Sequence, residues 1–164
     1  MKMTGHNEEQ IKTVKRNSNM VYRLAFSQMK NKEDADDVYQ DVFLRYLKNN
    51  PCFENAEHEK SWFIRVTLNC SKTSLKSFWK TRVAELDESF EAEPVSGEDL
   101  SFALNKLSKK HRAVIHLFYY EDMSTADIAN ALKLKEGNVR MLLTRARREL
   151  KKILEGEDCF EKRV

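Results

Sequence analysis

The basic side chains between residues 133 and 154 are the groups whose types and spacing most clearly predict a chemistry. This segment holds eight lysines and arginines but two acidic residues, interleaved with a regular apolar repeat. An α-helix turns by about 100° per residue, which places Val139, Leu143 and Ala146 on one side and most of the basic residues on the other. Solvated helix faces usually mix both signs to gain i,i+4 pairs. A face this uniformly basic therefore indicates contact with the phosphates of a nucleic acid.

A second, shorter helix is predicted directly before the basic one. Ser124 followed by Asp127 is a variant of the capping box, with aspartate at the position usually held by glutamate or glutamine. The short helix has an apolar face made of Ile128, Ala129 and Leu132. A break at residues 133–135 separates the two helices. Two helices joined by a tight turn, the second longer and basic, are typical of the helix-turn-helix of DNA-binding proteins.

Residues 31–49 predict a helix of opposite character. Its buried stripe, with spacings of three and four residues, consists of Ala35, Val38, Val42 and Tyr46. The other side carries Asp36, Asp37, Gln40 and Asp41, with Leu44 and Leu47 among them. An acidic face with apolar residues set into it is typical of a protein-binding surface. A solvated acidic helix with two incidental leucines fits the spacing equally well.

Residues 61–80 predict a third amphipathic helix, whose narrow polar face is basic. This face contains Trp62, Arg65, Asn69, Lys72 and Lys76. A basic track beside an aromatic ring suits single-stranded DNA, because unstacked bases stack on the ring while the cations attract the phosphates. Trp62 by itself is explained as well by a place at the edge of the core.

The charges form three blocks behind a net charge of +3. Residues 1–83 hold 15 basic and 10 acidic side chains, residues 84–99 hold seven acidic and no basic ones, and residues 100–164 hold 14 and 9. Pro94 and Gly97 in the acidic block are loop-forming. Four glycines and two prolines in the whole chain favour helices. We therefore predict an all-α protein of two small helical domains, residues 1–83 and 100–156, with an acidic linker at 84–99, a helix-turn-helix in the second domain, and a tail at 157–164.

Other chemistries find no support in the spacing of the residues. Three cysteines, without a CxxC pair, predict reduced thiols and no zinc site. The four histidines share no ligand spacing, and the chain has no phosphate-binding glycine loop or nucleophile elbow. We expect no enzyme, no catalytic or metal-binding residue, no cofactor and no small-molecule substrate. Because the sequence has no long apolar run, we expect no signal peptide and no transmembrane span. We therefore expect a cytoplasmic location.

Taken in order, these segments resemble the extracytoplasmic-function (ECF) group of bacterial sigma factors. Residues 21–49 look like the family's first conserved region and its core-polymerase-binding helix. Residues 61–80 look like the helix that recognises and melts the −10 promoter element, and residues 107–150 are similar to the region that recognises the −35 element. The resemblance implies a sigma factor whose partners are core RNA polymerase and promoter DNA. It also implies an anti-sigma factor, often membrane-bound in the family, that holds the protein at the membrane until it is released to the nucleoid.

The resemblance also assigns residues to each contact. Contact with core polymerase falls to Asp36, Asp37, Gln40, Asp41, Phe43 and Leu44. The −10 strand is assigned to Trp62, Arg65, Asn69, Lys72 and Lys76, with Asn69 the candidate for recognising an extruded base. The −35 major groove is assigned to Arg140, Thr144 and Arg148, and its phosphates to Arg145, Arg147 and Lys151. An arginine common in the family is replaced by Leu142, which leaves one DNA contact open.

A free-standing helix-turn-helix regulator is the alternative function. It explains residues 133–154 equally well, with the first domain serving for dimerisation or ligand sensing. It does not explain the second basic helix or the acidic helix with embedded leucines.

Overall fold

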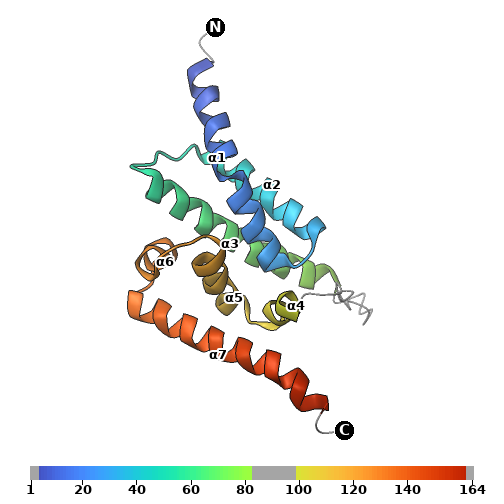
Figure 1. The fold of residues 1–164 in the computed structure, drawn as a ribbon. Coiled ribbons are helices and arrows are strands. Elements are labelled where there is room, and N and C mark those ends of the chain that lie inside the picture. Colours follow the sequence, from blue (N-terminus) through green and yellow to red (C-terminus); the bar gives the residue numbers. More distant parts are fainter. Residues whose placement is uncertain (1–3, 83–98, 162–164) are drawn as a thin grey trace. The chain divides into compact units, whose positions relative to one another are not determined.

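The computed structural model describes residues 4–82 and 99–161, and this part of the chain consists of helices joined by short connections (Figure 1). The helices are α1 (Thr4–Met29), α2 (Lys32–Asn49), α3 (Ala56–Arg82), α4 (Asp99–Lys106), α5 (Lys109–Ile115), the π-helical η1 (His116–Tyr120), α6 (Thr125–Leu132) and α7 (Glu136–Glu161). One compact unit contains α1, α2 and most of α3, and a second contains α4, α5, η1, α7 and most of α6. The predicted all-α class is confirmed. The predicted acidic linker lies outside the described residues, except for Asp99. Within the described ranges no helix is both long and apolar enough to span a membrane.

Side-chain caps set where the functional helices begin. The Asn31 Oδ1 accepts a hydrogen bond from the Asp34 amide at 2.8 Å, which starts α2. The Asn55 Oδ1 accepts one from the His58 amide at 2.8 Å, so α3 begins before the segment 61–80 that the apolar pattern outlines. The predicted cap at Ser124 is confirmed, because its Oγ accepts from the Asp127 amide at 3.0 Å.

The turn between α6 and α7 is closed by the backbone. Lys133 adopts a left-handed conformation with φ 56°, and the Leu134 amide donates to the Ala129 carbonyl at 2.9 Å. The Thr125 hydroxyl then donates to the Glu136 carboxylate at 2.9 Å, which joins the start of α6 to the start of α7. This arrangement confirms the predicted helix-turn-helix.

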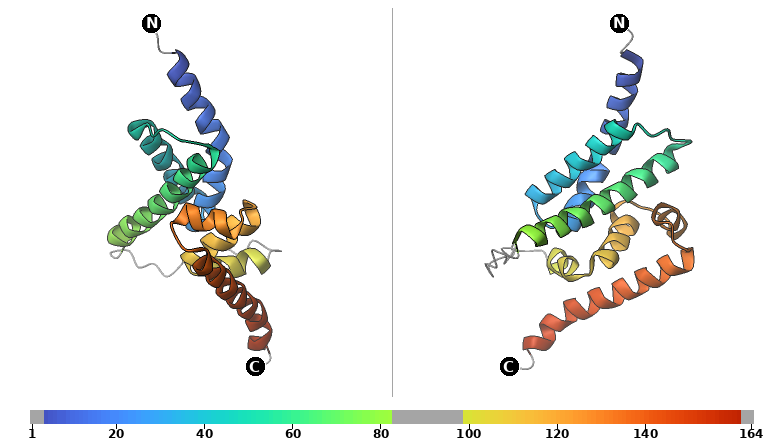
Figure 2. Two further views of the ribbon diagram at one scale, coloured as in Figure 1. Left: turned by 90° about the vertical axis from the view of Figure 1, so that its left-hand side faces the viewer. Right: turned by 180° about the vertical axis from the view of Figure 1, so that it is seen from behind.

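In the first unit α1 and α2 lie side by side, as both views of Figure 2 show. The predicted stripe of α2 is buried, with Ala35, Val38, Val42 and Tyr46 at most 4% exposed. The Tyr46 and Phe63 rings lie 5.4 Å apart between centroids, so α2 and α3 share an aromatic core.

An ionic cluster joins α1 to the first turn of α3. The Arg16 guanidinium donates to both carboxylate oxygens of Glu59, at 2.8 and 2.9 Å, and the Asn17 amide donates to the same carboxylate at 2.7 Å. Glu59 is 8% exposed. The bond from Arg16, helped by that from Asn17, holds the pKa of the Glu59 carboxyl below its usual range although desolvation opposes the shift. The cluster therefore fixes the start of α3 against α1.

In the second unit α7 packs along α5. The stripe of Val139, Leu143 and Ala146 predicted to face a core is buried, as are Val114 and Ile115 of α5. The His111 ring joins the two helices through a 2.7 Å contact between its Nδ1 and the Glu149 carboxylate. The backbone stays helical to Glu161, beyond the point where the sequence analysis placed the start of a tail.

We predict that Glu59→Ala lowers the free energy of unfolding by about 2 to 3 kcal/mol, because the buried Asn17 amide loses its charged acceptor. The control is Glu57→Ala, which removes an exposed carboxylate from the same helical turn and should change the free energy by less than about 0.5 kcal/mol. Urea denaturation followed by circular dichroism measures both. Equal losses in the two variants would contradict a role for the cluster.

We also predict that the stability difference between wild type and Glu59→Ala depends on pH. The Glu59 pKa is lower in the folded protein than in the unfolded chain, so its stabilisation is fully present above the unfolded value of about 4.3. It is lost as the pH falls through the folded pKa. The difference in stability between wild type and Glu59→Ala should therefore be constant between about pH 6 and 8 and shrink below about pH 4.

Candidate functional site

The outward face of α2 combines acid and exposed leucine. Asp37, Gln40, Leu44 and Leu47 are exposed and follow one another at spacings of three and four residues. Leu44 is 65% exposed and Leu47 is 48% exposed. A partner that covers the two leucines removes their apolar area from water, which favours binding. Exposed apolar side chains on a polar helix face are typical of a protein-binding surface. We call these four residues the α2 face.

Asp36 and Asp41 flank the α2 face and are half-buried. Asp36 lines a cavity of about 430 Å³ together with residues of α1. The Asp41 carboxylate lies 3.5 Å from the Arg45 guanidinium. Burial, and then a hydrogen bond to Asp41, raises the pKa of the Cys70 thiol to about 12, so the thiol stays protonated at neutral pH. Asp41 therefore already has contacts within the first unit.

Phe43 does not belong to the α2 face. Its side chain is 7% exposed, and its ring lies 4.8 Å from Tyr39 and 5.6 Å from Phe63 between centroids. The sequence analysis placed Phe43 with Leu44 on the partner-binding side, and this placement is wrong. The adjacent Val42 lies at the centre of the buried stripe, and an aromatic side chain one position away is long enough to reach into the core.

Along the polar face of α3, solvent exposure of the side chains increases from Trp62 to Lys72. Trp62 is half-buried, with its ring in edge contacts to Tyr46, Phe53 and Phe63 at centroid distances of 5.0 to 6.1 Å. Arg65 is half-buried, and Asn69 and Lys72 are exposed. The side chain of Lys76 lies outside the described residues. The spacing of three and four residues keeps these positions on one side of the helix.

The basic face of α7 is exposed along its length. Arg140, Thr144, Arg145, Arg148 and Lys151 are all exposed. The Arg140 guanidinium lies 2.8 Å from the Glu136 carboxylate, and Lys151 lies 3.9 Å from Glu155. Among the described residues Arg145 and Arg148 have no ion-pair partner. These two arginines are therefore uncompensated, unlike Arg140 and Lys151.

Met141 also lies on this basic face, and the sequence analysis gave it no role. Its side chain is 48% exposed. The signal was present in the helical spacing, because the residue is about 160° from the buried Leu143 at 100° per residue.

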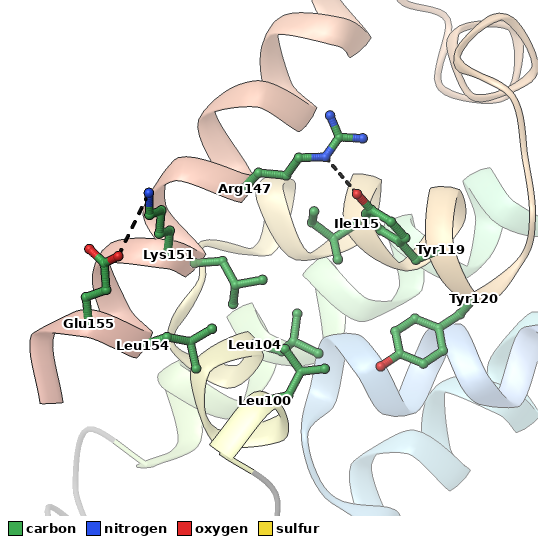
Figure 3. Close-up of a pocket in the computed structure, with 10 residues that line it drawn as sticks. Leu100, Leu104, Ile115, Tyr119, Tyr120, Arg147, Lys151, Leu154 and Glu155 are labelled. Carbon is green, nitrogen blue, oxygen red and sulfur yellow. Dashed lines mark hydrogen bonds and ion pairs between the residues drawn. The ribbon is translucent and has the colours of Figure 1, made fainter. Parts of the chain in front are cut away.

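Arg147 is engaged within the second unit. Its Nε donates to the Tyr119 hydroxyl at 2.8 Å (Figure 3). Its guanidinium lies 5.3 Å from the Phe118 ring centroid and 5.5 Å from the Tyr119 ring centroid. The side chain stands at the edge of an apolar groove of about 560 Å³ between α4, α5, η1 and α7. The groove is lined by Leu100, Leu104, Ile115, Tyr119, Tyr120, Arg147, Leu150, Lys151, Leu154 and Glu155. Twenty-eight residues separate Arg147 from Tyr119, so the helix pattern alone did not indicate this contact.

Within the described ranges no group of histidine, cysteine and acidic side chains has the arrangement of a metal site.

Comparison with known proteins matches both units to one family. Residues 13–81 match sigma-70 region 2, and residues 103–152 match sigma-70 region 4. The chain is 31% identical over 143 residues to the RNA polymerase sigma factor SigV of Bacillus subtilis (strain 168), over 84% of this chain and 86% of that protein. It is 28% identical over 154 residues to the ECF RNA polymerase sigma factor SigE of Mycolicibacterium smegmatis, over 86% of this chain and 60% of that protein.

A solved structure has the same fold. It is the co-crystal structure of the sigma factor RpoE with the anti-sigma factor NepR from Bartonella quintana, which aligns with a TM-score of 0.69 and 21% identity over 91% of this chain and 96% of the RpoE chain. A region 2 match over residues 13–81 leaves no room for the alternative of a free-standing regulator, whose first domain would sense a ligand or dimerise. The chain belongs to the ECF group of the sigma-70 family, and it is a promoter-specific transcription initiation factor rather than an enzyme.

Proposed function

We propose that the two units divide the work of a sigma factor. Residues 1–83 bind core RNA polymerase and recognise and melt the −10 element, residues 84–99 link the units, and residues 100–156 recognise the −35 element. The observation that carries this proposal is the presence of a polar, basic helix face in each unit: on α3, where Arg65 is half-buried and Asn69 and Lys72 are exposed, and on α7, where the basic residues are exposed. Two small basic faces bind DNA weakly when separate, because each neutralises few phosphates. Polymerase holds them at a fixed spacing, so that the second contact forms at high effective concentration.

The α2 face is the proposed contact with core polymerase. Leu44 and Leu47 supply the apolar centre, and Asp37 and Gln40 supply a polar margin. Asp36 and Asp41 contribute negative charge beside the face, and Asp41 keeps its ion pair with Arg45. Negative charge at this margin favours a basic surface on the partner and speeds encounter.

The polar face of α3 is the proposed site for the −10 strand. Asn69 has the donor and acceptor groups needed to recognise the edge of an extruded base. Lys72, Lys76 and Arg65 attract phosphates. The Trp62 ring is held by aromatic neighbours and half-exposed, which makes it a fixed platform for a base rather than a freely moving one.

The part of α7 from Arg140 to Lys151 is the proposed site for the −35 element. Arg148, Arg140 and Thr144 face base edges, and Arg145 and Lys151 hold phosphates. Arg140 must exchange its ion pair with Glu136 for a contact with DNA. Arg147 keeps its bond to Tyr119 through Nε and offers its remaining N–H groups to a phosphate at the edge of the site.

We also propose an anti-sigma factor as a regulatory partner, with release to the nucleoid in the active state. Support comes from the RpoE structure, which was determined with the anti-sigma factor NepR. Run-off transcription on pooled genomic promoter DNA, with core polymerase plus and minus this protein, tests the proposed function as a whole. Discrete transcripts that require both components support it, and tight footprints by the protein alone without transcripts contradict it.

We predict that Leu44→Arg weakens binding to core polymerase by at least about 30-fold, the loss expected for a central apolar contact. The matched control is Ile11→Arg, which places the same charge on an aliphatic side chain of α1 that is 54% exposed. Affinity is measured by fluorescence anisotropy with labelled protein, and circular dichroism verifies the fold. Wild-type affinity of a folded Leu44→Arg variant would remove the α2 face from the interface.

We predict that Asn69→Ala reduces open-complex formation about tenfold without changing affinity for core polymerase, since one set of base hydrogen bonds is lost. Permanganate reactivity of −10 thymines measures strand opening. Asn7→Ala, an exposed amide on α1, is the control. Normal reactivity with Asn69→Ala would exclude Asn69 from base recognition.

We predict different outcomes for the two uncompensated arginines of α7. Arg148→Ala should reduce transcription about tenfold from a promoter with an optimal −35 element and little from one whose −35 is scrambled, because a base contact is lost. Arg145→Ala should weaken DNA binding uniformly and reduce the slope of log affinity against log salt by about one, because a phosphate contact is lost. Lys110→Ala on α5 is the control. Equal effects of Arg148→Ala on both promoters would overturn its assignment to base edges.

A further inference from the structure

A line of four residues on α7 faces directly away from the core of the second unit. Gly137, Met141, Thr144 and Arg148 follow one another at spacings of four, three and four residues, which keeps them on one straight line along the helix. The buried residues Val139, Leu143 and Ala146 occupy the opposite side. When the basic face lies against DNA, this line is the part of α7 that reaches deepest into the groove.

Met141 is an exposed apolar side chain among cations. Single apolar residues on a surface are common and need no explanation. Leu154, which is 37% exposed on the same helix, is explained because it lines the apolar groove. Met141 is more exposed, at 48%, and it is flanked in sequence and on the helix surface by Arg140, Arg145 and Arg148. A surface built for phosphates alone would be better served by another cation at this position.

The two residues next to Met141 on this line, Gly137 and Thr144, offer no side-chain hydrogen-bond donor to a ligand. The Thr144 hydroxyl donates its hydrogen to the Arg140 carbonyl at 2.9 Å, within the helix. Its methyl group therefore remains as a donor-free, partly apolar surface one turn after Met141. One turn before Met141 there is no side chain, and a Cβ added to Gly137 would meet no atom within 4 Å. Packing inside the protein thus does not demand glycine there, whereas a bare backbone allows the double helix to come close.

We propose that Met141, together with the Thr144 methyl, recognises the 5-methyl group of a thymine in the major groove of the −35 element. The inference rests on the proposed function of α7 at that element. Thymine is the base that presents a methyl group in the major groove, and apolar side chains contact it there. The unbranched thioether of methionine adapts to the position of that methyl. Met141 is therefore a specificity-determining residue that favours a T·A pair, while the surrounding arginines supply affinity.

The experiment isolates the methyl group by replacing thymine with deoxyuridine, which keeps every hydrogen-bonding group and lacks the 5-methyl. Preferred −35 sequences are first selected from a randomised window by full-length protein with core polymerase. Each thymine of the selected element is then replaced singly by deoxyuridine, on either strand, and run-off transcription is measured. For wild type we expect about a fourfold loss at one position, the value for one buried methyl group.

Three variants identify the side chain responsible. In Met141→Ala the ratio of thymine to deoxyuridine promoters at that position should fall to about one, and Met141→Leu should retain a ratio above one. Thr144→Ser, which keeps the hydroxyl and removes the methyl, should reduce the ratio partially. Binding to core polymerase and circular dichroism should be unchanged in all three, because Met141 and Thr144 are exposed.

Other outcomes separate this inference from the proposed function. A selected −35 element without thymine in either strand, no sensitivity to deoxyuridine at any position, or full sensitivity retained by Met141→Ala each overturns the role of Met141. In those cases wild type still depends on the −35 element, so the proposed function stands. A wild type whose transcription is indifferent to the −35 sequence overturns the proposed function of α7 and the inference with it.

Discussion

Burial of one apolar stripe per helix decides which residues of this protein can meet a partner. Units of this size cannot bury helices on all sides. On α2 the burial of Val38 and Val42 turns Leu44 outward, and on α7 the burial of Leu143 and Ala146 turns Met141 outward. The exposed faces therefore consist of the residues that core packing leaves outside. A change in the buried stripe would rotate the helix and expose a different set of residues.

This dependence explains which features the sequence predicts. The stripes of α2 and α7, the Ser124 cap and the break before α7 follow from local spacing, and all four are confirmed. The resemblance assigned Phe43 to the polymerase contact position by position, and such an assignment does not show that the ring packs into the core of this chain. The Arg16–Glu59 and Arg147–Tyr119 contacts join residues 43 and 28 positions apart. Such pairs depend on how the helices pack against one another, and the apolar spacing within a single helix carries no information on that packing.

The cations of α7 are not equivalent, although the sequence shows them as one basic run. Arg140 and Arg147 are held by Glu136 and Tyr119, whereas Arg145 and Arg148 have no ion-pair partner within the described ranges. A held guanidinium keeps its position but must weaken one contact to form another. An uncompensated one gains the full attraction of a phosphate or base. In the proposed −35 contact, Arg145 and Arg148 therefore contribute more to affinity than Arg140 and Arg147.

Separation of the faces also separates the properties that they control. The α2 face and the basic face of α7 belong to different units with different cores, so substitutions in one should add independently to those in the other. Substitutions at exposed positions such as Met141 should leave the packing intact, because the buried stripe on the opposite side of the helix forms the core contacts. Under the proposed division of function, a change on α7 alters promoter preference while the proposed contact of α2 with polymerase is kept. This independence is the functional consequence of helices that are buried on one side.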